Sequence, residues 1–567
     1  MRALSLPYEL RLGITGHRQL EDEPAVAGGV ARLLDRIDGT LNQQDVAPLS
    51  WTVVSALARG ADRLFAEAVL DNKRGRLEVI TPFPVDEYRK DFDAETDSAH
   101  FERLLARAGQ VQQLEMVPGV AAPAGDSQVP ADEAAYLTAG ERLVDSSEIL
   151  VAIWNGRGSP GGGTADVVQY AVQQERVVIW LDSSRPDDPP KLVRSVRYSS
   201  DGLLDSACTT EFPPTANLLS RGYHQQARYC LDDSLPSELY ARHVGQRCGE
   251  LVHMAETSGL DSVALDTVLA GIVPQFVRAD QLARHYQRRH GWSVGGVLYV
   301  AAAAVTVAVG QVLFFPDRLW LILFEVLAML LVLGLWWFGR REAWHEKWLH
   351  DRYLAERLRT TTFTALVGAI SGQANDGDPL PFYRGPQHWL ARCVDTLARS
   401  ATAVPEQVPF EAVRRFVAMA WLRDQERFHS DTARRAGRRA ARRHALGFGL
   451  FGATLLMASL HFMGIGHESG SGRPTEVRLD LWITFLALVL PVWAGTIHAM
   501  TSQLELERIA ERSRRMGRAL GRMARQAGCA RTPGELRRIC TDAATLMTVE
   551  NREWWVLLSF HELRLHV

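Results

Sequence analysis

Residues 149–171 read ILVAIWNGRGSPGGGTADVVQYA, and this stretch decides the fold of the first third of the chain. An unbroken apolar run, ILVAIW, is followed by a glycine-rich turn and then by a segment whose apolar residues have helical spacing. A short apolar run between turn signals is typical of a strand that is buried on both faces of a parallel sheet. The order of strand, glycine-rich turn and helix predicts a βαβ unit whose turn can hold an anion.

The same alternation recurs throughout residues 1–185. The predicted strands cover residues 10–15, 51–56, 77–81, 111–117, 148–154 and 177–181. The predicted helices between them cover residues 25–41, 61–70, 99–108, 131–144 and 164–174. This pattern predicts an α/β domain, a doubly wound, mostly parallel, Rossmann-like sheet with helices on both faces. Such sheets bind ligands beyond the carboxyl ends of their strands.

Candidate binding residues follow four of the predicted strands. Glycine lets the backbone approach a ligand, and the positive end of a helix favours phosphate. Arginine can add bidentate contacts to phosphate, and an aromatic side chain can stack on a base. The predicted ligand-binding residues are Thr15, Gly16, His17, Arg18, Ser55, Arg59, Gly60, Asp62, Pro84, Tyr88, Arg142, Trp154, Asn155, Gly156, Gly161, Gly162, Gly163 and Thr164. Alternatively, Arg59 and Asp62 pair with each other and only hold their turn.

The sequence predicts no catalytic residue, no metal site and no cofactor beyond such a ligand. It contains no Walker-type loop, and its six cysteines are widely spaced with no CxxC pair, as expected of reduced thiols in a cytosolic compartment. The net charge of −3 shows no basic excess, so we expect no nucleic-acid partner. We also expect no signal peptide at the amino terminus.

Four long apolar runs occupy the second half of the 567-residue chain. Residues 291–316, 445–466 and 481–504 contain no Asp, Glu, Lys or Arg, and residues 319–339 contain one such residue, Glu325. A helix crosses the hydrocarbon core with about 20 apolar residues, so we expect an all-α domain with four membrane spans. The alternative is four helices buried in a soluble core. Glu325 either lines a pore and contributes to gating, or pairs with a neighbouring helix or reaches the outer interface.

Cations flank the spans mainly on one side and are much scarcer in the two hairpin connections. They cluster before the first and third spans and after the second and fourth, which predicts two hairpins with both termini in the cytosol. Beyond each hairpin we expect the helix to continue as a cytosolic stalk. Trp344 and Trp348 recur there at helical spacing, and they either pack in the stalk or anchor at the interface.

The two hairpins share short phrases. Arg288-Arg289-His290 and Arg442-Arg443-His444 precede them, and AERLR at 355–359 and AERSR at 510–514 follow them, at offsets of 154 and 155 residues. Order and offset predict a duplicated two-span module, although two unrelated hairpins with basic flanks remain the alternative. The predicted organisation is a sheet domain at 1–185, a linker and helical coupling segment at 186–283, two-span modules at 284–371 and 434–567, and a cytosolic helical connector at 372–433.

The phrases GITGHR, VVSALARGADRLFAEA, TPFP and LVDSSEILVAIWNGRGSPGGGTADVVQYA together resemble the SLOG superfamily over about residues 8–185. These are Rossmann-like domains related to the bacterial DNA-processing protein and to the "lonely guy" phosphoribohydrolases. The second half resembles SLATT modules, which are two-span effectors. That resemblance is carried by Tyr286-Gln287-Arg288-Arg289, Lys347-Trp348 and Ala355-Glu356-Arg357, and the second hairpin lacks the Lys-Trp pair.

The resemblance implies an antiphage or conflict-system effector of the bacterial inner membrane. Its cytosolic domain would sense a nucleotide-derived ligand, such as one related to NAD or ADP-ribose, and its spans would form a pore as a homo-oligomer in the lipid bilayer. The phosphoribohydrolase relatives carry a glutamate after the glycine loop, where this chain has Val167 with Asp166 nearest. We therefore expect a sensor and no enzyme. The alternatives are a membrane-tethered nucleotide hydrolase and a non-enzymatic membrane scaffold.

Overall fold

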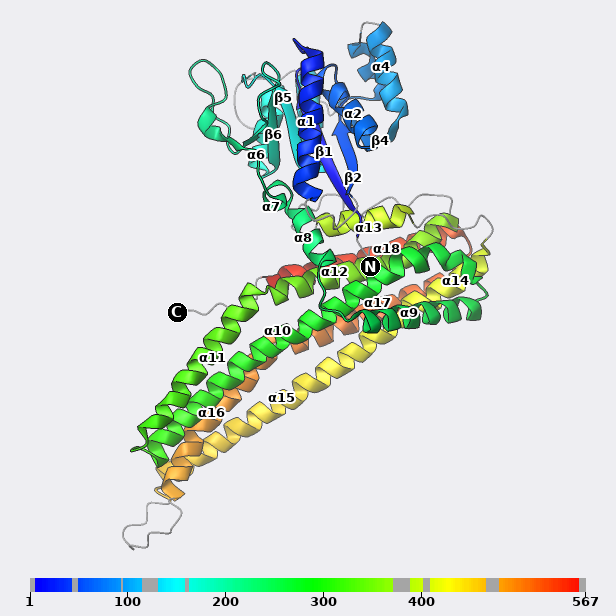
Figure 1. Ribbon diagram of the computed structural model, residues 1–567. Helices are drawn as coiled ribbons and strands as arrows, with labels where there is room; N and C mark the ends of the chain where they lie inside the picture. The colour runs from blue at the N-terminus through cyan, green and yellow to red at the C-terminus, as the bar shows by residue number, and fades with distance from the viewer. Residues whose placement is uncertain are drawn as a thin grey trace. The chain divides into compact units, whose positions relative to one another are not determined.

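The computed structural model describes residues 6–42, 49–92, 95–114, 131–158, 163–370, 388–400, 408–465 and 479–559 (Figure 1). The chain divides into two compact units. The first, the sheet unit, comprises Met1–Asp232 and Tyr383–Thr396, and the second, the helical unit, comprises Asp233–Phe382 and Leu397–Val567. The chain therefore passes between the two units three times.

The sheet unit is built on eight strands in the order β4-β3-β2-β1-β5-β6-β7-β8. Strands β1 to β6 all pair in parallel, whereas β7 and β8 add to the edge in antiparallel fashion. The strands are β1 Tyr8–Gly16, β2 Leu49–Ser55, β3 Arg76–Thr81, β4 Ala108–Gln113, β5 Ile149–Trp154, β6 Val177–Asp182, β7 Lys191–Val193 and β8 Thr209–Glu211. The helices are α1 Glu23–Leu41, α2 Ala61–Asn72, α3 Val85–Tyr88, α4 Glu95–Ala106, α5 Ala131–Ser146, α6 Thr164–Gln173, α7 Ala216–Leu219, α8 Arg221–Cys230 and α13 His388–Ser400.

The predicted α/β fold of the sheet unit is confirmed: each predicted strand and helix is present. The largest displacement is at β4, which begins at Ala108, inside the predicted helix, and ends at Gln113. The sheet also continues past residue 185, because β7 and β8 lie in the segment predicted as a linker and loop. Strands of three residues are too short to show an alternating pattern, so the sequence gives no signal for them.

Strand β5 forms the centre of the core. All six of its residues are buried, which explains its unbroken apolar sequence. Leu150 and Ala152 pack in one cluster with Leu143 and Val144 of α5 and Val168 of α6. The strand order reverses between β1 and β5, because the chain moves outward from β1 to β4 and then returns to the other side of β1. A crevice opens beyond the carboxyl ends of strands at such a switch point.

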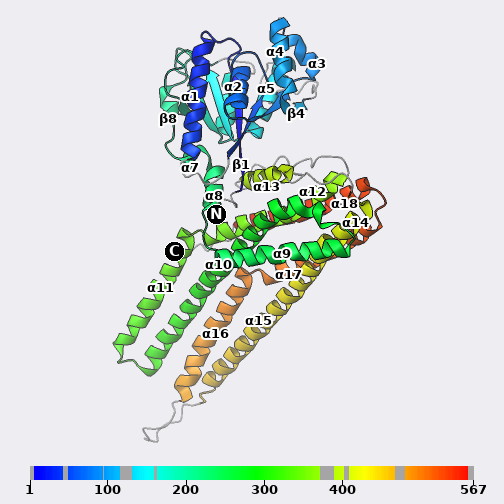
Figure 2. The same ribbon diagram turned by 45° about the vertical axis from the view of Figure 1, so that its right-hand side comes forward.

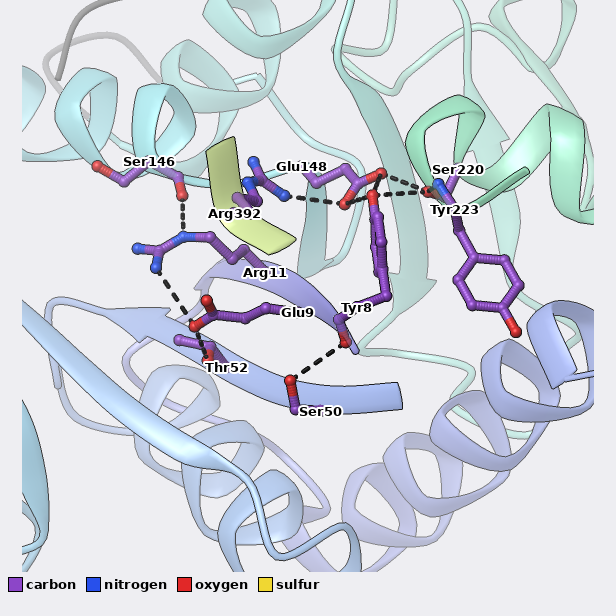
Figure 3. Close-up of polar contacts among 10 residues, drawn as sticks. All are labelled: Tyr8, Glu9, Arg11, Ser50, Thr52, Ser146, Glu148, Ser220, Tyr223 and Arg392. Carbon is purple, nitrogen blue, oxygen red and sulfur yellow. Dashed lines mark hydrogen bonds and ion pairs between the residues drawn. The ribbon is translucent and has the colours of Figure 1, made fainter. Parts of the chain in front are cut away.

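A buried polar cluster lies at the opposite end of these two strands (Figure 3). The hydroxyl of Tyr8 donates to the Glu148 carboxylate at 2.8 Å, and Arg392 of α13 donates to the same carboxylate at 2.9 Å. The hydroxyl of Ser220 also donates to Glu148. Arg392 comes from the segment predicted as a cytosolic helical connector at 372–433, and part of that connector, Tyr383–Thr396, belongs to the sheet unit.

The helical unit contains the four apolar runs, and its helices can be followed in Figure 2. Its helices are α9 Ser237–Thr257, α10 Asp266–Phe314, α11 Ile322–Arg341, α12 Trp344–Ile370, α14 Phe410–Phe416, α15 Asp424–Phe462, α16 Leu479–Gln503, α17 Leu506–Cys529 and α18 Pro533–Ser559. Within the described part of the chain, four helical stretches are long and apolar enough to cross a membrane: Ser262–Phe314, Leu319–Gly368, Phe410–Phe462 and Leu479–Cys529.

The apolar stretches are not buried inside the protein. Only 11 %, 0 %, 0 % and 22 % of their most apolar windows are buried. A soluble core would cover these side chains, so this exposure contradicts the soluble alternative and indicates a multi-pass membrane protein. The helices α10, α11, α15 and α16, which carry the apolar runs, lie side by side (Figure 2).

Each hairpin is followed by a break in the helix. Ala343, with φ of 51°, separates α11 from α12, and Glu505, with φ of 44°, separates α16 from α17. The prediction of a continuous helix is therefore wrong at both places, because a left-handed residue ends an α-helix. After each break the next helix packs back on the entering one, α12 on α10 and α17 on α15, so the two hairpins share this layout. The duplication itself stays a prediction.

The structure also places the predicted residues of the first hairpin. Trp348 is buried and stacks on His290 of α10, with ring centroids 5.9 Å apart, and Trp344 lies under the guanidinium of Arg289 at 5.6 Å. Both tryptophans therefore pack against α10.

Glu325 lies in the first turn of α11, beside the hairpin connection, where a negative charge is favourable at the helix amino end. It forms no ion pair within the described ranges of the chain.

Candidate functional site

A cavity of about 280 Å³ lies at the switch point of the sheet unit. Its walls come from the turn after β1, the start of α2, one face of α5, the end of β5 and the start of α6. Nine predicted residues line it: Thr15, Gly16, His17, Arg18, Asp62, Tyr88, Trp154, Gly163 and Thr164. The parallel sheet thus brings together residues that are separated by up to about 150 positions in the sequence.

A second hollow of about 380 Å³ adjoins this cavity. It is lined by Asn155, Glu21 and Ser183, among others, and it shares His17 and Arg18 with the first cavity. The backbone N–H of Asn155 donates to Nε2 of His17 at 3.1 Å, which fixes the imidazole between the two hollows. The site therefore has two compartments that meet at His17 and Arg18.

Two glycines hold the turn that carries His17 and Arg18. Gly60 has φ of +81°, and a Cβ there would lie 2.5 Å from the carbonyl oxygen of His17. A Cβ on Gly16 would lie 2.5 Å from the carbonyl oxygen of Ile153. The Ala61 N–H then donates to the His17 carbonyl at 3.1 Å. Glycine is required at both positions because neighbouring backbone atoms leave no room for a Cβ. The sequence analysis predicted a different reason, that glycine lets a ligand approach the backbone.

The cavity favours an anion. The helices α2 and α6 begin at its wall, at Gly60 and Gly163, and neither has a side chain that caps its first-turn amides. The amino end of a helix carries partial positive charge and free N–H groups. The exposed guanidinium groups of Arg18 and Arg157 also line the cavity, and neither forms an ion pair in the part of the chain that the structure describes.

Asp62 is the carboxylic acid of this cavity. Its side chain is buried, and burial raises its pKa from 3.8 to about 7, against the opposing effects of the Ala58 backbone and of the positive charges of Arg18 and Arg63. The next residue, Arg63, is structural: it is buried and donates to the Leu57 carbonyl at 2.9 Å. Asp62 therefore exchanges a proton near neutral pH, inside a site that otherwise carries positive charge.

One aromatic wall residue was missed by the sequence analysis. Tyr136 of α5 lines the cavity and is only half-buried, and the guanidinium of Arg18 lies 5.1 Å from its ring centroid. Burial raises the pKa of Tyr136 to about 12. The signal was present, because Tyr136, Gly140 and Leu143 recur on one helix face. Tyr136 is better placed to stack on a base than Tyr88 and Trp154, which are almost fully buried.

Trp154 offers a hydrogen-bond donor. It lines the cavity, its ring packs 5.3 Å from that of Trp180, and its buried indole N–H has no partner among the described residues. An unpaired buried donor is costly, so a polar ligand atom that reaches it gains affinity.

Other predicted residues shape the site without lining the main cavity. Ser55 is buried and its Oγ accepts from the Leu57 N–H at 2.9 Å, which holds the turn after β2. The Pro84 carbonyl accepts from the Tyr88 N–H at 3.0 Å and so begins the turn that presents Tyr88. Gly156, with φ of +75°, packs on Trp180. These residues, like Gly60, position the residues that line the cavity.

The remaining predicted residues fall outside the cavity. Arg59 is exposed, and no ion pair joins it to Asp62 in the described ranges, so the structure does not contain the pairing considered as an alternative. Arg142 lies on α5 away from the lining. Gly161 and Gly162 lie outside the described residues. Asp166 does not line the cavity either.

The described residues contain no cluster of three or more His, Cys, Asp or Glu side chains suited to a metal ion. No protein-family model matches this chain, and no curated protein matches its sequence.

Proposed function

We propose that this chain is a ligand-gated membrane effector whose sheet unit senses a nucleotide-derived anion. One observation carries the proposal: two helix amino ends without a side-chain cap and two arginines without an ion pair to a described carboxylate converge on a cavity at the switch point of a doubly wound sheet. This combination is suited to phosphate groups.

The walls favour a nucleotide over inorganic phosphate. Tyr136 provides a half-exposed ring for a base, and the Trp154 N–H and the Asp62 carboxyl can bind hydroxyl or carbonyl groups of the ligand. The adjoining hollow gives room for a second moiety beyond His17. A dinucleotide or an ADP-ribose derivative fits this two-compartment site, in keeping with the resemblance to SLOG domains.

Strand β5 offers a route from the ligand to the helical unit. Trp154 ends the strand at the cavity, and Glu148 precedes it at the opposite end, where it binds Arg392 of α13. The chain enters the helical unit after Thr396, within α13 itself. A ligand that favours one position of β5 therefore changes the free energy of α13 docking, and this coupling transmits occupancy to the membrane segments.

The membrane part acts as a homo-oligomer in the bacterial inner membrane, with both termini in the cytosol. A bundle of four spans leaves little room for water, so several copies surround the path. Ligand binding opens this path and stops growth of an infected cell, as the resemblance to SLATT effectors implies.

Asp62 supports a second candidate, a membrane-tethered hydrolase of nucleotide N-glycosidic bonds. A carboxylic acid with a pKa of about 7 suits general acid catalysis at neutral pH. Water would add to the anomeric carbon while the bond to the base breaks and Asp62 protonates the leaving base, and the proton released by the added water would return to Asp62. Asp62, rather than Asp166, is the residue to change in a test of this activity.

Proteoliposomes test both candidates. Purified full-length protein is reconstituted with an entrapped dye, and leakage is measured with and without NAD, ADP-ribose and nucleoside monophosphates, while chromatography measures release of free base. Ligand-dependent leakage without base release supports the sensor. Base release that is lost in Asp62→Asn supports the hydrolase, and vesicles that stay tight with every ligand contradict the gated effector.

A further inference from the structure

A basic groove runs between α15 and α17 of the helical unit. Its volume is about 590 Å³, and it is lined by Arg434 and Arg438 of α15 and by Arg514 and Arg518 of α17. Glu426 is the only acidic residue of its lining, so four positive charges and one negative charge give a formal charge of +3. This groove takes no part in the site of the sheet unit.

Small residues form the floor of the groove. A Cβ on Gly517 would lie 3.2 Å from Oγ of Ser430 on the facing helix, so the two helices are in close contact there. A Cβ on Gly437 would point toward the Arg514 guanidinium, 3.8 Å away. With glycine at these positions, the arginine side chains face an open space and not a neighbouring side chain.

Two of the four guanidinium groups form no ion pair within the described residues. Arg434 pairs with Asp431 at 2.6 Å and Arg514 pairs with Glu511 at 2.7 Å, each across one turn of its own helix. Such exposed pairs contribute little and exchange readily for a stronger anion. Arg438 and Arg518 form no ion pair within the described ranges. Arginine binds phosphate oxygens through two parallel hydrogen bonds, so the groove can hold a phosphodiester from both sides.

The groove lies beside the membrane-spanning segments. Arg438 precedes Ala445, where the charge-free run of α15 begins, by seven residues, or about 10 Å of helix. The headgroup layer extends roughly 5–8 Å beyond the hydrocarbon core, and an arginine side chain reaches several ångströms further. The Arg438 guanidinium, and Arg514 which faces Gly437, therefore lie at the end of the groove nearest the lipid phosphates. Arg518 lies farther from the membrane, because the adjacent Gly517 packs on Ser430, which precedes Ala445 by 15 residues, or about 22 Å of helix.

The first hairpin provides an internal comparison. There Asp280 of α10 pairs with Arg284 at 3.0 Å and lies 4.0 Å from Arg352 of α12. Glu356 of α12 pairs with Arg352 at 2.5 Å and with Arg359 at 2.8 Å. Acidic residues thus neutralise the arginines where α10 meets α12, so an uncompensated basic groove is not a general consequence of a cytosolic stalk.

We propose that the groove between α15 and α17 binds the phosphodiester headgroup of an anionic phospholipid. The bound headgroup joins the second hairpin to its cytosolic helix at the membrane surface. The proposal requires membrane insertion but is independent of the ligand of the sheet unit.

Native mass spectrometry of the full-length protein in detergent tests this site. The probes are phosphatidylglycerol and phosphatidylcholine with the same acyl chains, and inorganic phosphate as a competitor. We expect the double variant R438Q/R514Q, at the membrane-proximal end of the groove, to bind phosphatidylglycerol at least about tenfold more weakly than the unchanged protein, because two charge-assisted contacts are lost. The control R435Q/R522Q removes two exposed arginines of the same helices outside the groove and should bind as the unchanged protein does.

Three results would overturn the proposal. Equal weakening in the groove and control variants would indicate non-specific attraction to cationic helices. Equal binding of phosphatidylcholine would show that the negative charge is not recognised. Complete displacement by inorganic phosphate at the lipid concentration would indicate a site for a free anion. Both substituted positions are exposed, and R438K/R514K, which keeps the charge but not the bidentate geometry, should fall between the two double variants.

Discussion

Arg392 binds Glu148 at 2.9 Å although 244 residues separate them in the sequence. Both side chains are largely buried, and Tyr8 and Ser220 complete the donors around the carboxylate (Figure 3). This contact holds α13, which continues into the helical unit, on the end of the sheet opposite the cavity. It is the structural basis of the coupling that we propose.

Arg392→Gln should release α13 from the sheet unit. Removal of one partner of a buried ion pair is strongly destabilising for the contact, because the other charge stays buried. We expect faster amide hydrogen exchange in peptides from α13, and ligand-induced leakage from proteoliposomes should fall several-fold while ligand affinity changes less than about threefold. The control Arg185→Gln removes an exposed surface pair with Asp182. Unchanged exchange in α13 would refute this role of the contact.

Arg18→Gln should weaken the binding of phosphate-containing ligands. Arg18 lines both compartments and forms no ion pair with a described carboxylate. Loss of one charge-assisted contact, about 1.5–3 kcal/mol, corresponds to roughly 10- to 100-fold in affinity by calorimetry. Arg59→Gln, an exposed arginine outside the cavity, is the matched control and should bind normally. If both variants bind equally well, the anion lies elsewhere.

Asp62 should make ligand binding depend on pH. The pKa of Asp62, about 7, lies above its ordinary value of 3.8, so the folded protein holds this proton up to neutral pH. The stability that the bound proton gives to the folded state is therefore lost as the pH rises toward 7. Above pH 7 the carboxylate repels an anion. We expect the affinity for NAD, whose phosphates keep their charge, to rise several-fold from pH 8 to pH 6. Asp62→Asn should remove this slope, and a variant that retains it would assign the titration to another group.

Gly60→Ala should destabilise the sheet unit. The substitution strains a backbone with φ of +81° and places a methyl group 2.5 Å from the His17 carbonyl oxygen. We expect the free energy of unfolding to fall by about 1–3 kcal/mol. Each kcal/mol should lower the melting temperature of the full-length protein by roughly 2–4 °C. Gly39→Ala in α1, where a Cβ meets nothing within 4 Å, should be neutral or slightly stabilising. Equal melting temperatures would show that the turn relaxes.

Glu325→Gln should alter ion selectivity if several copies surround a pore. Loss of a carboxylate in the first turn of α11 should lower the preference for cations, measured as a shifted reversal potential in planar bilayers under a salt gradient. Asp317, exposed in the same hairpin connection, offers the control Asp317→Asn. An identical reversal potential in Glu325→Gln would indicate that this residue faces away from the ion path.

The local pattern of the sequence was sufficient for most elements. The apolar runs predicted β1, β2, β3, β5 and β6, and the helical spacing predicted the helices between them, because burial on a sheet or helix face requires apolar residues at fixed intervals. The four candidate spans followed from length and lack of charge alone. The strands β7 and β8 and the breaks at Ala343 and Glu505 did not follow, because short strands and single left-handed residues leave no periodic signal.

The sequence by itself determined which turns end at the ligand-binding edge of the sheet, since every parallel strand presents its carboxyl end there. Only the tertiary structure decided that Tyr136 forms a cavity wall, that Gly60 serves backbone packing, that Asp62 is the buried acid, and that Arg392 reaches Glu148. The physical reason is that burial, pKa and pairing depend on neighbours brought together by packing. Those neighbours are distant in the sequence, and a local pattern such as the helix face of Tyr136 does not show which surface it will face.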